Sequence, residues 1–330
     1  MSLPEIPLHD YRAGSLLGFA LDHAAQADAL MARVLTGAGL APGMIAPALR
    51  LADQIATRRL WAIRDPFQDE ILAVARQIKR PGPVFFNLSY EFGCTARVFE
   101  TGGPPRLFRT LDWPFQGLGA EICVIRLKAP AGEWALASWP GIMGCLQGVA
   151  PGRFTIALNQ APALQSGLGR GIDWLIQKQH FFRAEGIPPA HLLRQVFESA
   201  PDYATAARML AETPLAAPVI FTLAGMAPGE ACVIERRETS HAARPDPIAA
   251  NHFETGLRRE ATWRARGIQS HARQRQAAGL AEMPCLTDLP EPVLNAQTRL
   301  AFAADAGGFL ALAGYEGPAQ VTELAEFDLG

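Results

Sequence analysis

The sequence lacks a long hydrophobic run and an excess of charge of either sign. No apolar segment among its 330 residues reaches the ~18 residues that a membrane-spanning helix needs. The formal net charge is −2, so there is no general basic field for a nucleic acid, and the basic stretch between Arg258 and Arg275 is the one local exception. These absences argue against a membrane-spanning protein and against a nucleic-acid-binding protein.

Cysteine is scarce and scattered. The five cysteines form no CxxC pair and are odd in number, which argues against a zinc-cysteine site and against a disulfide scaffold. Five of the histidines, at positions 180, 191, 241, 252 and 271, also lack the spacing of metal ligands. We therefore expect no metal and no cofactor, and we expect any cysteine chemistry to use a single thiol.

Targeting signals and repeats are also missing. The first twenty residues lack a basic start that leads into an apolar stretch and a small-residue cleavage site, which predicts a cytoplasmic protein. There is no internal repeat, low-complexity tract or phosphate-binding loop. What the chain does have is 49% hydrophobic residues, enough for the sizeable core of a globular enzyme.

The hydrophobic pattern changes along the chain. Residues 14–78 have apolar side chains at helical spacing, and this segment either packs on the rest or offers a partly apolar face to a lipid-like ligand. Pro81 and Pro83 end the helical pattern, and residues 84–86 lead into the next stretch. Strands are predicted at 122–127, 134–139, 154–158, 219–223, 231–235, 300–303 and 309–313. Helices are predicted within 172–210, the last of them at 204–210 behind the N-cap Asp202. This order predicts an α+β fold with antiparallel sheets.

The stretch from Asn87 to Phe115 places three reactive side chains near one another. Gly-Gly-Pro-Pro at 102–105 reverses the chain between two predicted strands, so Cys94 on the first faces Arg109 and Asp112 on the second. A thiol, a guanidinium and a carboxylate can serve as nucleophile, electrostatic partner and orienting acid. The alternative is a buried core cysteine beside a surface ion pair.

Several motifs together resemble the acid ceramidase and N-acylethanolamine acid amidase family of N-terminal nucleophile hydrolases. They are NLSYEFGCTARV followed by RTLDWPF, then GVAPGRFTIALNQ, then TPLAAPVIFTLAGMAPGEACVIERRE, and finally AANHFE followed by SHARQR. These motifs cover most of residues 84–280 in the order that the family has them. The resemblance implies a four-layer αββα sandwich of two antiparallel sheets, preceded by a helical segment.

The resemblance also implies self-cleavage between Gly93 and Cys94. Residues 1–93 would become a separate helical subunit, and residues 94–330 would form the catalytic subunit with Cys94 at its N-terminus. An α-amine titrates near ~7.7 to 8 and a thiol near ~8.5, so Cys94 could then supply both nucleophile and base. Gly93 has no side chain to hinder the attack and tolerates a strained backbone.

Further site residues follow from the family match. Arg109 would favour the thiolate or hold the substrate carbonyl, Asp112 would orient the new α-ammonium, and Asn251 would donate its side-chain NH2 to the oxyanion. Arg273 best fits the family's downstream arginine, and Arg264 is its rival. For the arginine and aspartate pair, and for Asn251, the alternatives are a surface ion pair and a turn or cap.

Substrate contacts are expected from Asn159, Gln160 and Trp113. The family has a glutamate after the asparagine, whereas this chain has Gln160, which keeps the hydrogen-bonding shape but cannot titrate. Trp113 adjoins Asp112 and is expected to line an acyl pocket. Cys123 and Cys232 are expected to be small core residues, and Cys145 lies in a turn without a base nearby in sequence.

The implied reaction is hydrolysis of a linear N-acyl amide, such as an N-acylethanolamine or a ceramide, without a cofactor. The open alternatives are another acyl-amide hydrolase or acyltransferase on the same fold, acting on penicillin, bile salts or acyl-homoserine lactones, and a non-enzymatic binding protein. The expected partner is a lipid-like small molecule, with possible peripheral contact with a membrane or micelle and no nucleic acid. Self-association is not indicated by the sequence.

Overall fold

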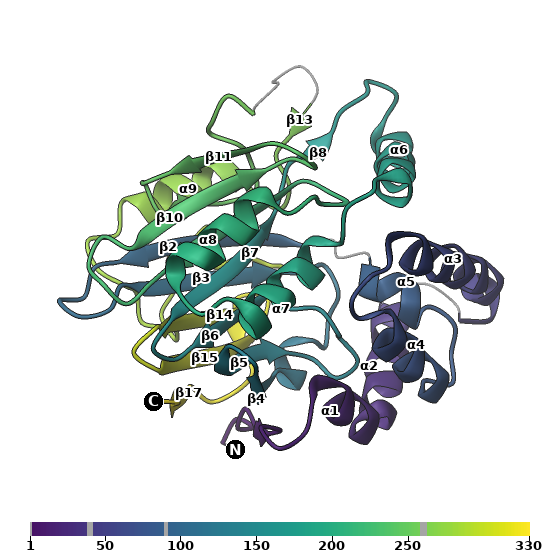
Figure 1. Cartoon of the computed structure of the whole chain (residues 1–330), viewed down its shortest axis with the longest axis horizontal. Helices are drawn as coiled ribbons and strands as arrows, with labels where there is room; N and C mark the ends of the chain where they lie inside the picture. Colours follow the sequence, from purple (N-terminus) through teal and green to yellow (C-terminus); the bar gives the residue numbers. More distant parts are fainter. Residues whose placement is uncertain (1, 38–41, 89–91, 258–262) are drawn as a thin grey trace.

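The computed structural model of the chain describes residues 2–37, 42–88, 92–257 and 263–330. The first segment forms a group of helices on one side of the molecule (Figure 1). These are α1 (Leu16–Asp22), α2 (Ala24–Gly37), α3 (Pro42–Ile63), α4 (Gln68–Gln77) and α5 (Pro83–Leu88). Ser15 caps α1 by accepting a hydrogen bond from the backbone of Gly18. None of the helices in the described ranges is both long and apolar enough to cross a membrane.

Two β-sheets form the centre of the rest of the fold. In the described residues, the larger sheet has the order β1 (Leu8–Asp10), β4 (Cys123–Ala129), β5 (Gly132–Ser138), β6 (Gln147–Ala150), β7 (Phe154–Gln160), β9 (Val219–Ala224), β10 (Ala231–Arg236) and β11 (His241–Arg244). The second has the order β12 (Ile248–Ala249), β2 (Gly93–Phe99), β3 (Arg106–Asp112), β14 (Thr298–Asp305), β15 (Phe309–Glu316) and β16 (Ala319–Gln320), with β17 (Ala325–Asp328) also on β15. A separate pair joins β8 (Ala163–Leu164) and β13 (Trp263–Arg264).

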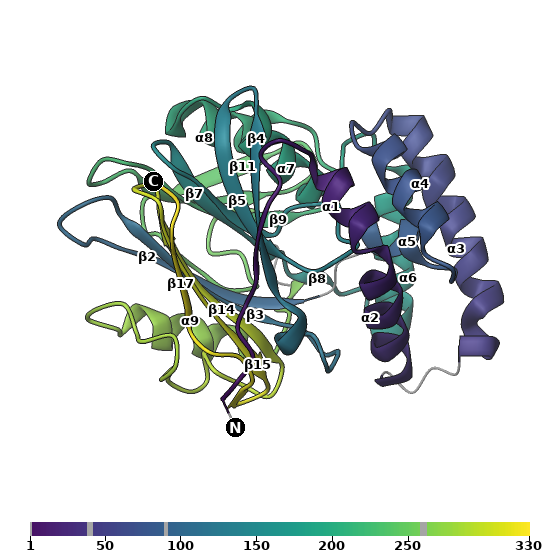
Figure 2. The same ribbon diagram turned by 90° about the horizontal axis from the view of Figure 1, so that it is seen from below.

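The two sheets lie face to face between helices, as Figure 2 shows. Helices α7 (Pro189–Ser199) and α8 (Tyr203–Glu212) cover the outer face of the larger sheet, and α9 (Ser270–Ala278) covers the second. Asp202 caps α8 by accepting a hydrogen bond from the backbone of Thr205. The α+β class and the four-layer order expected from the sequence are therefore confirmed.

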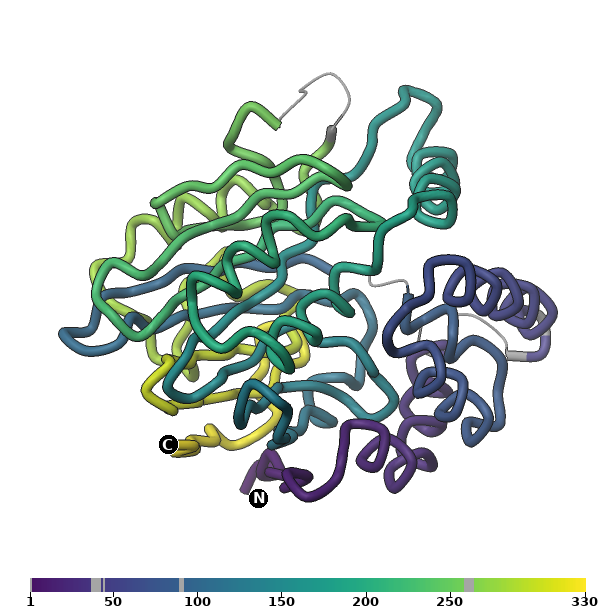
Figure 3. The backbone as a smooth tube through the Cα atoms, in the orientation of Figure 1, coloured from purple at the N-terminus to yellow at the C-terminus, as the bar shows by residue number. Residues whose placement is uncertain are grey.

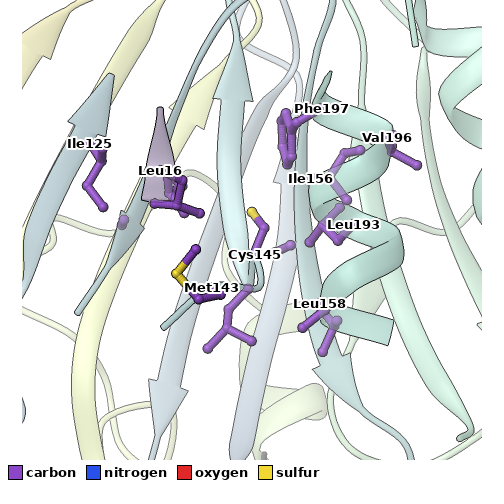
Figure 4. Packing of buried hydrophobic residues seen from close by; sticks show 14 of the residues in the cluster. Leu16, Ile125, Met143, Cys145, Ile156, Leu158, Leu193, Val196 and Phe197 are labelled. Carbon is purple, nitrogen blue, oxygen red and sulfur yellow. The ribbon is translucent and has the colours of Figure 1, made fainter. Parts of the chain in front are cut away.

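The core follows the helical spacing of α7. Leu193, Val196 and Phe197 are fully buried and point toward Ile156 of β7 (Figure 4). Phe197 also stacks on Trp134 of β5, with ring centroids 5.3 Å apart and planes at 9°. This packing fixes β7, whose far end reaches the candidate site.

Three features differ from the sequence expectations. Residues 84–86, which follow the predicted end of the helical part at Pro81 and Pro83, lie in a further helix, α5. The first segment is not purely helical, because β1 pairs in parallel with β4 at the edge of the larger sheet. The region between β10 and β14, for which the sequence analysis gives no strand or helix, holds β11, β12, β13 and α9. The backbone trace in Figure 3 shows β1 reaching away from the helices to the sandwich. Short, polar or parallel-paired segments carry little periodic signal, which explains these differences.

A buried hydrogen bond between a histidine and an aspartate joins the first segment to the sandwich. His191 Nδ1 of α7 lies 2.7 Å from Asp65 Oδ2, between α3 and α4, and His191 Nε2 lies 3.1 Å from the Asn87 carbonyl of α5. Burial opposes ionisation of Asp65, but the charge and hydrogen bond of His191, the Phe67 N–H and Arg194 outweigh burial and lower the pKa of Asp65. The pair thus links segments on either side of Gly93.

We expect Asp65→Asn to lower the free energy of unfolding by about 1.5–3 kcal/mol at neutral pH, because the His191 ring and the Phe67 N–H then lose a charged hydrogen-bond partner. Because the pKa of Asp65 is lower in the folded chain than its ordinary value of 3.8, the ionised carboxylate stabilises the fold at any pH above 3.8. This stabilisation is lost as the pH falls through the lower pKa of the folded state. The deficit of Asp65→Asn should therefore shrink below about pH 4. Urea unfolding at several pH values measures this, with the exposed Asp246→Asn as a control.

Candidate active site

The β2–β3 hairpin brings Cys94 and Arg109 together. Ala96 pairs with Arg109 across the two strands, so Cys94, two residues earlier, points to the same face of the sheet. Arg109 Nη2 lies 2.9 Å from Cys94 Sγ. The same guanidinium donates to the carbonyl oxygens of Leu158 at 2.7 Å and Leu146 at 3.1 Å. The strand spacing that the sequence indicates therefore produces a direct contact between thiol and guanidinium.

Burial controls the state of the Cys94 thiol. Burial raises the pKa of Cys94, Arg109 and Arg273 oppose this effect, and Asp112 adds to it, so that the pKa stays above its usual value. The thiol is therefore protonated at neutral pH in the uncleaved chain.

Arg273 connects the backbone of Cys94 to the other polar groups. Its Nη1 donates to the Cys94 carbonyl and lies 3.2 Å from Asp112 Oδ2, and its Nη2 donates to Asn251 Oδ1 at 2.8 Å. Asn251 Oδ1 also accepts from the Cys94 N–H at 2.7 Å. All four of these residues are fully buried. Arg264, the rival, lies 3.5 Å from Asp173 with 35% of its side chain exposed.

Hydrogen bonds at both Oδ1 and Nδ2 orient the side chain of Asn251. Its Nδ2 donates to the Gln160 carbonyl at 2.8 Å, so in the uncleaved chain the NH2 group faces a backbone oxygen. Its backbone N–H donates to Ser270 Oγ at 2.9 Å, which connects it to the start of α9. The structure thus brings Asn251 beside the amide nitrogen of Cys94.

The two residues at the end of β7 differ in position. Gln160 Oε1 accepts from the Phe92 N–H at 2.8 Å and so contacts the segment that precedes the bond between Gly93 and Cys94. Asn159 is fully buried, and its Nδ2 donates to the carbonyls of Ala249 and Ala250 at 3.2 Å each. Asn159 therefore supports the backbone that leads to Asn251.

Trp113 belongs to a cluster of aromatic side chains next to Asp112. It is 9% exposed and packs against Phe92, Phe115 and Trp139, with ring centroids 5.7–6.3 Å apart. It lines an apolar cavity of about 300 Å³ between the first segment and the sandwich. Met31 and Phe86 line the opposite part of this cavity.

Close packing, rather than unusual backbone geometry, accounts for glycine at position 93. Gly93 lies within β2, opposite Asp112, and is not among the described glycines with positive φ. A Cβ on Gly93 would lie 3.2 Å from the Gly267 Cα and 3.4 Å from Asp112 Oδ2. The backbone strain expected at this position is not present in the described structure.

The remaining cysteines lie apart from this arrangement or support the core. Burial raises the pKa of Cys123 to about 12 and also raises that of Cys145, which belongs to the main core cluster. Cys232, expected in the core, is half-buried on β10. Cys94 is thus the cysteine that contacts Arg109.

Several supporting residues escaped the sequence analysis. Thr298 of β14 donates its hydroxyl to Asp112 Oδ1 at 3.0 Å, and Thr95 Oγ1 accepts from Arg273 at 2.9 Å. Ser270 and Gly267 flank Asn251 and Arg273. Ser270 stands three residues before Arg273 in the SHAR motif, which is a weak signal, while Thr298 has none because its contact depends on the β3–β14 register.

Comparison with known proteins finds relatives named acid ceramidase. No family model matches the chain. Acid ceramidase of Mus musculus is 33% identical over 221 residues, covering 60% of this chain and 55% of the mouse protein. Acid ceramidase of Balaenoptera acutorostrata scammoni is 27% identical over 208 residues, covering 57% and 51%. The chain is similar to acid ceramidases over more than half of its length. These matches confirm the resemblance that its motifs indicate.

The acid ceramidase relatives are longer than the matched region, and the chain spans about half the length of those it matches. Among solved structures, the Caenorhabditis elegans N-acylethanolamine-hydrolyzing acid amidase ortholog has a TM-score of 0.49 and 18% identity, covering 66% of this chain and 93% of that one.

The choice between Arg273 and Arg264 can be tested by substitution. We expect Arg273→Met to cost about 3–5 kcal/mol of unfolding free energy, because Asp112 is left buried without its counter-charge. Arg264→Met should cost at most about 1 kcal/mol, because its partner contact is long and partly exposed. Urea unfolding of both variants in a Cys94→Ala chain measures the difference. Equal losses of unfolding free energy in the two variants would contradict the choice of Arg273 over Arg264.

Thiol reactivity tests the state of Cys94. The hydroxyl of Thr287 hydrogen-bonds to exposed Cys285 and lowers its pKa, so iodoacetamide at neutral pH should modify Cys285 in the full-length chain and leave Cys94 unmodified. Peptide mapping of the full-length band by mass spectrometry measures this, and urea-unfolded chain should be modified at both. Equal labelling of the two in the folded chain would contradict the buried, protonated thiol.

Proposed function

We propose that the chain is an amide hydrolase that cleaves itself between Gly93 and Cys94 and then hydrolyses a linear fatty-acyl amide. The observation that carries this proposal is the arrangement of Cys94. Its thiol contacts Arg109, while its amide nitrogen donates to Asn251 Oδ1 beside Arg273. Cys94 therefore carries both a nucleophilic thiol and a hydrogen-bonded backbone nitrogen. This suits an enzyme in which cleavage turns that nitrogen into a free α-amine.

The self-cleavage would proceed through a thioester. The Cys94 thiol adds to the Gly93 carbonyl carbon, the carbon–nitrogen bond breaks, and the thiol proton passes to the released amine. Water then hydrolyses the thioester, which leaves a carboxylate on Gly93 and a free α-amine on Cys94. Asp112, opposite Gly93 in the hairpin, is placed to accept a hydrogen bond from that amine once it is protonated.

Amide hydrolysis would use the same atoms. The α-amine takes the thiol proton, the thiolate attacks the substrate carbonyl, and the α-ammonium returns the proton to the departing amine. Water resolves the acyl thioester. Arg109 stabilises the thiolate, and Asn251 Nδ2 would exchange its bond to the Gln160 carbonyl for one to the oxyanion. Arg273 holds Asn251 and the Cys94 backbone in place.

The apolar cavity supports an acyl substrate. Its volume of about 300 Å³ and its aromatic walls suit a hydrocarbon chain, and Trp113 connects it to Asp112. The relatives are named acid ceramidases, which agrees with a fatty-acyl amide and does not favour penicillin, bile salts or acyl-homoserine lactones.

Exposed apolar side chains support delivery of such a substrate from a lipid surface. On α3, Leu51, Ile55 and Trp61 are 41–58% exposed. On α6 (Arg170–Arg183), Trp174 and Leu175 are 41% and 60% exposed, and Trp174 also lines the apolar cavity. We propose that these helices contact a micelle or membrane surface peripherally.

Cleavage is the direct test. The purified chain should separate on a denaturing gel into fragments of residues 1–93 and 94–330, and N-terminal sequencing of the larger should begin at Cys94. Cys94→Ala should stay intact and lose at least ~10³-fold in amidase activity, because nucleophile and base are both lost. Cys285→Ala is the matched control and should behave as the wild type.

A substrate panel separates the candidate reactions. We expect hydrolysis of an N-acylethanolamine or ceramide and little turnover of penicillin V, a conjugated bile acid or an acyl-homoserine lactone. Unchanged amidase activity in Cys94→Ala would refute the proposed nucleophile. A chain that remains intact and inactive at both acidic and neutral pH would favour a binding protein.

A further inference from the structure

Three residues with metal-binding side chains converge behind Asn251 and Arg273. His252 and Glu254 follow β12, and His271 is the second residue of α9. One potential ligand atom from each lies within 4.8 Å of the others. Their separation along the chain hides this group from any spacing argument, because the fold alone brings α9 beside β12.

His252 is held in a defined orientation. It is 6% exposed, its Nδ1 lies 2.7 Å from Ser270 Oγ, and its Nε2 lies 2.8 Å from Glu254 Oε1. The ring of exposed His271 lies against it, with centroids 3.8 Å apart. Nε2 therefore points toward the other two residues, while Nδ1 points toward a fixed hydroxyl.

Glu254 is anchored through its backbone. The buried carboxylate of Glu235 accepts hydrogen bonds from the Glu254 N–H at 2.8 Å and from the N–H and hydroxyl of Thr255 at 3.1 and 2.6 Å. Glu235 is in turn paired with Arg244 at 3.2 Å. Glu235 thus fixes the turn that carries Glu254, while 39% of the Glu254 side chain remains exposed.

We propose that His252, Glu254 and His271 bind a divalent transition metal of the zinc class. Two imidazole nitrogens and one carboxylate oxygen are a ligand set that Zn²⁺ favours, and the exposed side leaves room for water as a further ligand. With Nε2 on the metal, His252 carries its proton on Nδ1 and donates it to Ser270 Oγ, as the second shell of such sites commonly does. Small side-chain movements would bring the ligand atoms to bonding distance.

The site is coupled to the candidate active site through Ser270. Its Oγ accepts from the Asn251 N–H and contacts His252 Nδ1, and Arg273 lies one turn further along α9. A metal that joins His252 to His271 would therefore fix the junction from which Asn251 and Arg273 project. This inference does not depend on the proposed amidase activity.

Zinc binding is measured by competition with a chromogenic chelator. The full chain carries Cys94→Ala and Cys285→Ser, so that neither thiol competes for the metal. We expect one Zn²⁺ per chain and a raised melting temperature on addition of zinc. Glu254→Gln and His271→Ala, at exposed side chains, should each weaken zinc binding at least about tenfold without changing the metal-free melting temperature.

His241→Ala, at an exposed histidine on β11, is the matched control and should bind zinc like its parent. Cobalt(II) in place of zinc should give visible absorption that both ligand variants lose. Zinc binding no tighter than about millimolar in the parent would overturn the proposal, as would equal affinity in the parent and both ligand variants.

Discussion

The candidate site depends on the guanidinium of Arg273, which lies in the protein interior without access to water. An unpaired charge there would be costly, so its position is set by the acceptors that surround it: the Cys94 carbonyl, Asn251 Oδ1 and Asp112. Cys94 and Asp112 belong to the β2–β3 hairpin, and Asn251 belongs to the turn after β12. Satisfying one buried cation therefore fixes the hairpin, the turn after β12 and helix α9 relative to one another.

A second buried cation, Arg109, organises the opposite side of Cys94. It joins the thiol to carbonyls at the ends of β6 and β7 and so connects the two sheets across the sandwich. The two arginines bracket Cys94 at its sulfur and at its backbone. The thiol nevertheless stays neutral in the uncleaved chain, because burial outweighs the two positive charges. The arrangement is preorganised before it is reactive.

The local part of this site was predictable from the sequence, and the long-range part largely was not. The turn at 102–105 sets the hairpin register, so Cys94 and Arg109 could be paired by counting along two strands. Arg273 was reached only through the resemblance, since nothing local shows that α9 packs on β2. Spacing also missed the convergence of His252 and His271. Strand β1 and helix α5 escaped notice because three residues, or six beside two prolines, are too short for a periodic pattern.

Strand β1 has a consequence for how the two parts of the chain depend on each other. It covers the edge of the larger sheet by pairing with Val124, Ile125 and Arg126 of β4. A protein that began at Cys94 would leave that edge of β4 open, with unpaired backbone groups able to recruit a strand from another molecule. By pairing with β4, β1 therefore blocks this sheet edge against pairing with another molecule. The first segment would still do so as a separate polypeptide, for as long as β1 stays paired with β4.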